Sequence, residues 1–313
     1  SAHQVEVSYK YYSVDKGGKR TELSEAPVNV GNYVVVATWA ANKNYPELKA
    51  EDTFTVSPAA VTVTVTGHKA TVVFDGDPHS VSGYDITADH RLYDVDDMVE
   101  GPAQTIKAER TAEGTTNMGL SAGNFANTSD NFTVTFNVTD GSITITPQSI
   151  DPKDPAYKGV NVKKPADVYY NGKSQQQKPV VTDKDGNVLT EGTDYELSYS
   201  KDTVNVGEVT VTVTGKGNYT GSVEVTYNIK KIKITVTDTK TVTYNELEQT
   251  LEITGAKATG QVEGETVTVT GAVIKGTLVG EYTTVESYTW SVEKADGKDS
   301  TGNYEIEVTG KLT

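Results

Sequence analysis

The chain contains no cysteine. Disulfides and thiolate metal sites are therefore excluded, and each folded module must be stabilised by its own hydrophobic core. The sequence also has no apolar run as long as a membrane helix needs, no secretion signal and no lipidation motif. We therefore expect no membrane insertion in this segment, and we expect it to be an interior piece of a longer protein.

Basic residues are few. The 313 residues include 28 Lys and Arg against 43 Asp and Glu, which gives a formal net charge of −15. Nucleic-acid binding depends mostly on Lys and Arg that neutralise phosphates, so nucleic acid is not an expected partner. The acidic balance suits a solvated, extracellular surface.

Catalytic and metal-binding motifs are missing as well. The sequence has no Gly-x-Ser-x-Gly elbow, phosphate loop or His-Glu-x-x-His motif. Two acidic runs resemble the start of a calcium loop, but the run from Asp94 to Gly101 fails the pattern at Met98, and "DKDGN" (residues 183–187) is followed by Val188 where glycine is required. Asp185-Gly186 is better interpreted as a hairpin turn.

Histidines and carboxylates give no specific site either. One group in residues 59–149 contains His68, His79, His90, Asp89, Asp94, Asp96 and Asp97. Its spacing satisfies no zinc or calcium pattern, so we interpret it as a polar strand end and an acidic loop. Glu191 and Asp194 are the best candidate for an acid–base pair, yet they lie in a glycine-containing turn. We predict no catalytic residue, no metal, no cofactor and no enzymatic activity, and the binding residues stay unknown.

Strict alternation of valine and threonine is the clearest positive signal. Val209, Val211 and Val213 alternate with threonines, and the run from Val61 to Val65 has the same pattern. A period of two indicates half-buried β-strands with threonine on the solvent face. No stretch of useful length has helical periodicity.

Three landmarks recur in a fixed order along the chain. They are an aromatic turn, a middle glycine and an Asn-aromatic pair. The aromatic turns are Phe74-Asp75-Gly76, Tyr170-Asn171-Gly172 and Tyr244-Asn245-Glu246; the middle glycines are Gly31, Gly119, Gly207 and Gly280; the pairs are Asn44-Tyr45, Asn131-Phe132, Asn218-Tyr219 and Asn303-Tyr304.

The repeats predict four modules, at residues 1–58, 59–149, 150–231 and 232–313. Their edges fall near Pro58, Pro147 and Lys231, where one strand ends and another begins. The first module lacks an aromatic turn, and its residues 1–9 align with residues 77–84. We therefore expect it to be truncated at its N-terminus, or completed by something outside the sequence.

The landmarks also predict local structure. After each middle glycine we expect a long strand, then the Asn-aromatic pair in a polar turn, then a last strand. Gly31 and Gly207 stand where a turn enters a strand, a place that often needs positive φ. Gly and Asn accept the positive φ of tight turns, and the aromatic that follows is expected to cover the core or a neighbouring strand.

The stretches from Phe74 to Ile86, Gly114 to Ile145 and Tyr170 to Gly221 resemble the tandem immunoglobulin-like repeats of bacterial surface proteins, including the MBG or YDG type. The resemblance implies an all-β chain of tandem immunoglobulin-like β-sandwich modules in an elongated array. It also implies a place on the cell surface or in the cell wall, often of Gram-positive bacteria. Tyr244-Asn245-Glu246 departs from the pattern, because glutamate replaces glycine. Some similar sandwiches form Lys–Asn isopeptide crosslinks, and that option stays open.

Three classes of function remain. The first is a non-catalytic adhesin stalk or spacer with weak adhesive contacts of its own. The second is a recognition module for a host glycan or an extracellular host protein, for which residues 83–114, the longest stretch without alternation, are the place to look. The third is an accessory segment of a large secreted enzyme. We expect a monomer in each case.

An elongated array predicts a large radius of gyration. Strands of about ten residues at roughly 3.3 Å per residue make each module about 33 Å long, so four in line span about 130 Å. A thin rod of that length has a radius of gyration of about 37 Å, whereas a compact body of this chain length has about 20 Å. Small-angle X-ray scattering distinguishes the two, and a value near the compact limit would exclude the elongated array.

Overall fold

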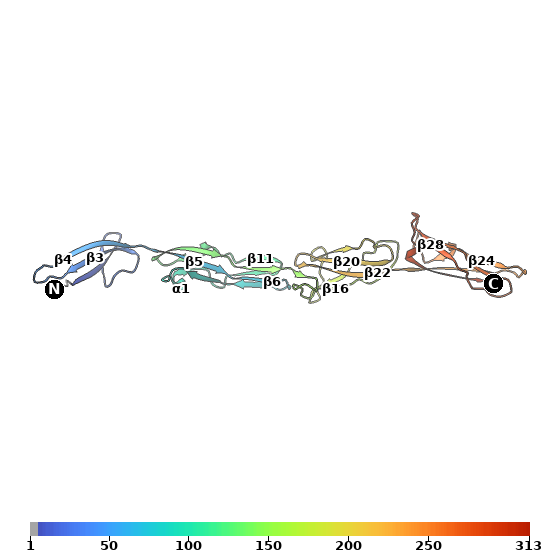
Figure 1. Cartoon of the computed structure of the whole chain (residues 1–313), viewed down its shortest axis with the longest axis horizontal. Coiled ribbons are helices and arrows are strands. Elements are labelled where there is room, and N and C mark those ends of the chain that lie inside the picture. Colours follow the sequence, from blue (N-terminus) through green and yellow to red (C-terminus); the bar gives the residue numbers. More distant parts are fainter. Residues whose placement is uncertain (1–5) are drawn as a thin grey trace. The chain divides into compact units, whose positions relative to one another are not determined.

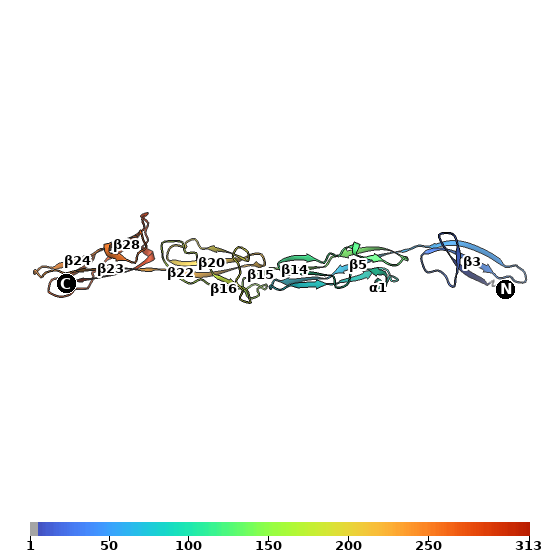
Figure 2. The same ribbon diagram turned by 180° about the vertical axis from the view of Figure 1, so that it is seen from behind.

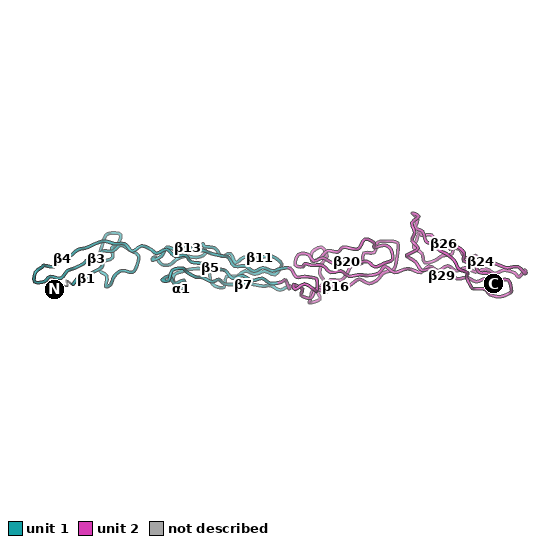
Figure 3. The backbone as a smooth tube through the Cα atoms, viewed as in Figure 1, with its two compact units in different colours: residues 1–72, 76–146 teal, residues 73–75, 147–313 magenta. Residues whose placement is uncertain are grey.

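The computed structural model describes residues 6–313, and the regular secondary structure of these residues is almost entirely β-strand. This confirms the all-β prediction. The chain divides into two compact units, one of residues 1–72 and 76–146 and the other of residues 73–75 and 147–313 (Figure 3). Residues 73–75, which include Phe74 and Asp75 of the first aromatic turn, thus belong with the unit that follows them. The division into four modules stays a prediction.

The first unit opens with one antiparallel sheet in the order β2-β1-β3-β4 (Figure 1). Its strands are β1 (Val7–Val14), β2 (Arg20–Leu23), β3 (Gly31–Trp39) and β4 (Leu48–Val56). Among residues 6–58, only Tyr33 and Val34 are buried hydrophobic residues, and no second sheet covers this one. The predicted alignment of residues 1–9 lies partly outside the described residues.

Residues 59–146 form the remainder of the first unit. The elements are β5 (Ala59–Gly67), β6 (Lys69–Val73), β7 (His79–Ser82), β8 (Tyr84–Ala88), α1 (Val95–Met98), β9 (Val99–Glu100), β10 (Lys107–Arg110), β11 (Gly114–Asn117), η1 (Ala122–Asn124), β12 (Ala126–Asn127), β13 (Phe132–Thr139) and β14 (Ser142–Thr146). The main sheets have the orders β13-β5-β8 and β11-β14-β6. The last long strand, β13, runs parallel to the first, β5. Val61, Val63 and Val65 are buried, as the alternation predicted.

The second unit begins with residues 147–231. Its elements there are β15 (Gln148–Ser149), β16 (Asn161–Lys163), β17 (Val168–Tyr169), β18 (Val180–Thr182), β19 (Tyr195–Tyr199), β20 (Gly207–Gly215), β21 (Tyr219–Thr220) and β22 (Ser222–Lys230). The main sheet has the order β17-β22-β20-β19. Val209, Val211 and Val213 on β20 are buried, which again confirms the alternation.

Residues 232–313 complete the second unit (Figure 2). The elements are β23 (Ile232–Lys240), β24 (Gln249–Ile253), η2 (Gly255–Lys257), β25 (Ala258–Thr259), β26 (Thr266–Thr270), β27 (Ala272–Gly276), β28 (Thr289–Glu293), η3 (Thr301–Asn303) and β29 (Tyr304–Leu312). The last strand, β29, is parallel to the first, β23, as β13 is to β5. One hydrophobic cluster contains Val211, Tyr227, Ile234 and Ile274, so the core is continuous across residue 231.

The structure separates two kinds of repeat that the landmarks had merged. Gly31 and Gly207 each begin a long strand, and the chain returns after the Asn-aromatic pair along β4 or β22, as predicted. The prediction is wrong for the other two glycines. Gly119 lies in a loop before η1, and Gly280 lies in a loop before β28. In those two repeats the long last strand pairs with the first strand in parallel instead of returning along a hairpin.

The expected positive φ holds for some glycines only. Gly207 has φ +155° and Gly119 has φ +85°, whereas Gly31 does not have positive φ. At Gly31 the constraint is space, because a Cβ would lie 3.0 Å from the Tyr33 hydroxyl, which donates a hydrogen bond to the Asn29 carbonyl. The asparagines of the four pairs also lack positive φ, so the prediction that they supply it is wrong.

Gly207→Val is expected to lower the free energy of unfolding around β20 by about 1 to 3 kcal/mol. A Cβ at Gly207 meets nothing within 4 Å, so the cost comes from the backbone conformation and not from a clash. Hydrogen exchange of the β20 amides measures the loss. Glu208→Val, at the next, exposed position of the same strand, is the control and should stay within about 0.5 kcal/mol. Equal values for the two variants would show that the glycine is incidental.

The third aromatic turn is kept despite its glutamate. Its third residue, Glu246, has φ +66°, as Gly76 (φ +91°) and Gly172 (φ +73°) have at the same position. Among the described residues, Glu246 is the only non-glycine residue with positive φ. The Asn245 Oδ1 atom accepts a hydrogen bond from the Leu247 backbone N–H at 3.1 Å, and Asn171 makes the same contact with the Lys173 N–H at 2.9 Å.

Glu246→Gly is therefore expected to stabilise this turn. A left-handed conformation costs an L-residue about 1 to 2 kcal/mol, and the added chain entropy of glycine offsets part of the gain, which leaves about 0.5 to 1 kcal/mol. Thermal unfolding followed by the fluorescence of Trp290, in a Trp39→Phe background, reports on this part of the chain. A loss of stability would contradict the proposed strain.

Candidate functional site

The histidines and aspartates of residues 59–149 are engaged in local structure. The His68 Nδ1–H donates to the Ser82 carbonyl at 2.8 Å and Nε2 lies 3.4 Å from Asp85, and these contacts raise the pKa of His68. The Asp89 Oδ1 atom accepts from the Thr62 N–H, and Asp94 caps α1 through the Asp96 N–H. Residues 6–313 contain no group of three or more potential ligands that could hold a metal ion.

The remaining members of that group are separate from one another. His79 lies in β7 and Asp97 lies in α1. The His90 ring packs against Phe132 with ring centroids 5.2 Å apart, and its Nδ1 accepts a hydrogen bond from the Leu92 N–H. His90 thus belongs to an apolar contact.

Residues 83–114 hold more packed structure than the sequence indicated. They contain β8, α1, β9 and β10, and Tyr84 and Tyr93 are buried. The Tyr84 hydroxyl donates to the Pro102 carbonyl and the Tyr93 hydroxyl to the Met98 carbonyl, at 2.7 and 3.0 Å. The Tyr84 and Tyr93 rings therefore serve the core of this stretch, whereas Leu92 is exposed.

The Glu191 and Asp194 carboxylates are used separately. Glu191 pairs with Lys178 at 2.6 Å, and Asp194 accepts a hydrogen bond from the Thr190 N–H at 2.8 Å. The Asp194 contact closes the turn that leads into β19. The arrangement explains both residues as parts of a turn.

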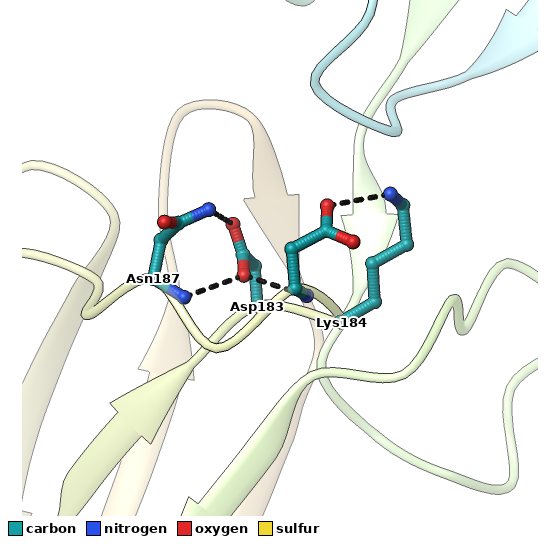
Figure 4. Close-up of polar contacts among 4 residues, drawn as sticks. Asp183, Lys184 and Asn187 are labelled. Atoms are coloured by element: carbon teal, nitrogen blue, oxygen red, sulfur yellow. Dashed lines mark hydrogen bonds and ion pairs between the residues drawn. The ribbon is translucent and has the colours of Figure 1, made fainter.

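Asp183 organises the turn that follows β18 (Figure 4). Its Oδ1 accepts hydrogen bonds from the N–H groups of Asp185 and Asn187, both at 2.9 Å, and its Oδ2 accepts from Asn187 Nδ2 at 2.8 Å. The Asn187 amide, with these backbone contacts, lowers the pKa of Asp183. Gly186 has φ +88°, and Thr182 pairs with Val188, so the predicted hairpin turn is confirmed.

The isopeptide option finds no support from burial. A crosslink of this kind needs a buried lysine beside an asparagine. The buried polar residues in the described part of the chain are Gln148, Ser149, Thr203, Ser300 and Asn303. No lysine belongs to this set.

Two asparagines of the Asn-aromatic pairs, by contrast, make hydrogen bonds across the predicted module boundaries. The Asn131 Oδ1 accepts a hydrogen bond from the Val30 N–H at 2.8 Å, and its Nδ2 donates to Asn29 Oδ1 at 2.9 Å. Asn131 belongs to predicted module 59–149, whereas Val30 belongs to module 1–58. The asparagine of one repeat thus binds the backbone of the repeat before it.

The same contact occurs between predicted modules 150–231 and 232–313. The Asn303 Oδ1 accepts from the Val206 N–H at 2.8 Å, and its Nδ2 donates to Asn205 Oδ1 at 3.1 Å. The residues that Asn131 and Asn303 contact lie in two copies of a Val-Asn-Val-Gly sequence, at residues 28–31 and 204–207. Asn303 is only 5% exposed, so its three polar contacts, which include Ser300 Oγ at 3.2 Å, are made away from solvent.

Two of the three aromatic turns meet the aromatic of the Asn-aromatic pair in the following repeat. Phe74 and Tyr219 lie edge to face with ring centroids 5.5 Å apart at 81°, and Tyr170 and Tyr304 do the same at 5.5 Å and 79°. All four rings are buried. Burial raises the pKa of Tyr219 to about 12 and also raises those of Tyr170 and Tyr304. Edge-to-face pairs add about 0.5 to 1.5 kcal/mol each beyond the burial of their area.

One carboxylate joins the Tyr170–Tyr304 pair. Glu265 accepts hydrogen bonds from the hydroxyls of Tyr170, at 2.7 Å, of Ser300, at 3.2 Å, and of Tyr304. The Tyr304 oxygen accepts in turn from the Val262 N–H at 3.1 Å. These hydroxyl and carboxylate groups are thus used in structural contacts. The network joins Tyr170 to Glu265, 95 positions further along the chain, and to Ser300, 130 positions further along.

Sequence reasoning identified the aromatic turns and the pairs but not their mutual contacts. We call the contacts of Asn131 and Asn303, together with the two aromatic edges, the junction contacts. The repeated Val-Asn-Val-Gly sequence was a signal that could have indicated the partner, since only its glycine had been used. Glu265 carries no signal of its own in a chain with 43 acidic residues.

No helix in residues 6–313 is long and apolar enough to cross a membrane. No family model and no curated protein matches the chain. One solved structure with detectable similarity is a SusE-like surface-located polysaccharide-binding protein from the heparin utilisation locus of Bacteroides thetaiotaomicron. It is 9% identical with a TM-score of 0.18, and the alignment covers 100% of this chain and 55% of that one. A TM-score this low does not establish a shared fold, so that protein's ligand does not bear on this chain.

Proposed function

We propose that this chain is a non-catalytic repeat segment of a bacterial cell-surface protein that acts as an adhesin stalk or spacer. Its modules are immunoglobulin-like and in tandem, with β-sandwiches at residues 59–149, 150–231 and 232–313, similar to the MBG or YDG type, and a module truncated at its N-terminus at residues 1–58, where one sheet is present. The segment lies outside the cell, at the surface or in the wall.

The observation that carries the proposal is the repetition of the junction contacts. A spacer needs neighbouring modules that hold one another, and landmark side chains are used for that purpose at all three predicted boundaries. Asn131 and Asn303 bind the preceding Val-Asn-Val-Gly sequence, and Tyr170 and Tyr304 pack together. The carboxylates considered for catalysis are used in turns and ion pairs, which fits a structural role.

A recognition module for a host glycan or host protein is the second candidate, and one observation favours it. Tyr244, Leu247, Leu278 and Val279 are exposed around a hollow of about 210 Å³ in residues 232–313. Exposed apolar patches with polar rims often mark binding surfaces. Here the rim includes Asn245 and Gln249, whose amides are suited to hydroxyl groups.

Glycan and host-protein arrays probed with the intact chain distinguish the two functions. The spacer predicts no saturable ligand on either array. Saturable binding that Tyr244→Ala abolishes, and that Tyr9→Ala keeps, would replace the spacer by the recognition module. Tyr9 is the matched control, because it is also an exposed tyrosine, at 59% against 55% for Tyr244.

A further inference from the structure

The chain contains a single Asn-Gly pair, Asn171-Gly172, which lies in the second of the three aromatic turns. Asn171 is exposed, and its Oδ1 atom accepts the hydrogen bond from the Lys173 N–H at 2.9 Å. Gly172 has φ +73°. The side-chain amide carbon of an asparagine is an electrophile, and the backbone nitrogen of the next residue is the nucleophile nearest to it along the chain. The turn therefore holds two groups that can react with each other.

Two features of the turn favour attack of the Gly172 nitrogen on Asn171 Cγ. The Lys173 N–H stabilises the negative charge that develops on Oδ1 in the tetrahedral intermediate, as the donors of an oxyanion hole do. Among the hydrogen bonds of residues 6–313, none involves the Gly172 N–H, so the attack breaks no backbone contact. Glycine also carries no Cβ that would shield the nitrogen.

Packing against the following repeat favours glycine at this position. A Cβ at position 172 would lie 3.0 Å from Val262 Cγ1, and φ +73° is unfavourable for a residue with a Cβ. The Val262 N–H in turn donates to the Tyr304 hydroxyl oxygen, in the network around Glu265. The close approach that joins the two repeats thus keeps a reactive Asn-Gly bond in the turn.

The other two aromatic turns are natural variants of this one. In Asp75-Gly76 a carboxylate replaces the asparagine amide, and Gly76 still has positive φ, at +91°. In Asn245-Glu246 the amide and its hydrogen bond to the next N–H but one are kept, but glutamate replaces glycine. The first turn shows that a carboxylate is compatible with this conformation. The third places a Cβ beside the attacking nitrogen and restricts the backbone rotation that attack needs.

We propose that Asn171 is a site of spontaneous deamidation that alters the junction between residues 150–231 and 232–313. The Gly172 nitrogen bonds to Asn171 Cγ, the bond from Cγ to Nδ2 breaks, and ammonia leaves with the proton of the Gly172 amide. Water then opens the resulting succinimide at either carbonyl, which gives aspartate or isoaspartate. No oxidant, reductant or cofactor takes part. The modification rests on the turn and its packing, and it would hold whether or not the segment is a surface spacer.

Isoaspartate at position 171 lengthens the main chain by a methylene directly after Tyr170. The Tyr170 ring is 2% exposed, lies edge to face on Tyr304 and donates its hydroxyl to Glu265. The longer main chain displaces this ring from its contacts, so the isoaspartyl form is less stable at the junction. Aspartate keeps the ordinary main chain, as Asp75 does in the first turn. The effect on the junction therefore comes from isoaspartate and not from the added charge.

Incubation of the folded full chain in mildly alkaline buffer, followed by peptide mapping with mass spectrometry, tests the site. Asn171 is expected to react about tenfold or more faster than Asn245, because a Cβ beside the nitrogen excludes most of the backbone conformations through which attack passes. Glu246→Gly converts the third turn to Asn-Gly and should bring Asn245 close to the rate of Asn171. Because the turn stabilises the oxyanion, Asn171 should react in the folded chain at least as fast as in the urea-unfolded chain.

Any of three results overturns the site: equal rates at Asn171 and Asn245, no increase at Asn245 in Glu246→Gly, or a slower reaction of Asn171 in the folded than in the unfolded chain. The effect on the junction has its own test. Ion exchange isolates the aged chains, which carry an additional negative charge, and Asn171→Asp is the control with the same charge. In the Trp39→Phe background, the isoaspartyl chain should unfold at a lower urea concentration than this control, as Trp290 fluorescence reports. Equal midpoints would show that the modification leaves the junction intact.

Discussion

Tyr304→Ala is expected to lower the free energy of unfolding of residues 232–313 by about 3 to 5 kcal/mol. The ring is 1% exposed and lies edge to face on Tyr170. Its hydroxyl donates to Glu265 and accepts from the Val262 N–H, so its removal leaves a cavity together with two polar groups that have lost a partner. Urea unfolding followed by Trp290 fluorescence, in a Trp39→Phe background, measures the loss.

Two further variants separate the effect of the Tyr304 ring on stability from the effect of its hydroxyl group and from that of the Asn-aromatic motif. Tyr304→Phe keeps the aromatic edge and removes only the hydrogen bonds, so a loss of about 1 to 3 kcal/mol is expected. Tyr45→Ala changes the same residue type in the same motif, but its ring is 70% exposed, and the change should stay within about 0.5 kcal/mol. A Tyr304→Ala variant as stable as Tyr45→Ala would show that the Tyr170–Tyr304 contact contributes little.

The strands were the part of the fold that the sequence predicted best. Alternation is a local signal, because each strand must present every second side chain to the core. The burial of Val61, Val63 and Val65 on β5 and of Val209 and Val211 on β20 follows from it directly. The Asp185-Gly186 turn was predictable for a similar reason, since its geometry is decided within five residues.

The repeat connections were less predictable. The middle glycine and the Asn-aromatic pair have the same order in all four repeats, but β13 and β29 pair with first strands in parallel, whereas β4 and β22 return along hairpins. Pairing between strands some seventy residues apart is decided by the whole sheet and leaves no local mark. Glu246 is the opposite case, because the environment imposes positive φ on a residue whose own preference is against it.

The partners of the asparagines were not predicted, although both lie in the repeated Val-Asn-Val-Gly sequence. Asn131 and Asn303 have no distinctive neighbours in the chain, and the groups that they bind lie 101 and 97 positions away. Asparagine is common in turns for local reasons, and those reasons predicted a positive φ that the structure does not show. The expectation that the aromatic of each pair covers the core or a neighbouring strand holds for Tyr219 and Tyr304, which pack on the aromatic turn of the preceding repeat, but it is wrong for Tyr45, which is 70% exposed.

The junction contacts of the asparagines predict the second large effect on stability. Asn303→Ala is expected to lower the free energy of unfolding around the 231/232 boundary by about 2 to 3 kcal/mol, because it leaves the Val206 N–H without its acceptor in a partly buried place. Asn131→Ala removes the equivalent bond to Val30 at a more exposed junction, so about 1 kcal/mol is expected there. Trp290 fluorescence follows the first variant in the Trp39→Phe background, and Trp39 follows the second in a Trp290→Phe background.

A double-mutant cycle decides whether Asn303 acts across the junction or only within its own repeat. Its Nδ2 donates both to Asn205 Oδ1 in the preceding repeat and to Ser300 Oγ in its own. If the junction carries the effect, Asn303→Ala and Asn205→Ala are coupled by about 0.5 to 1 kcal/mol, and hydrogen exchange accelerates at Val206 and Gly207 as well as at η3. A coupling of zero, with faster exchange confined to residues 300–304, would assign Asn303 to the interior of its own repeat. In that case the Tyr170–Tyr304 edge and the Glu265 network would be the contacts that join the two repeats.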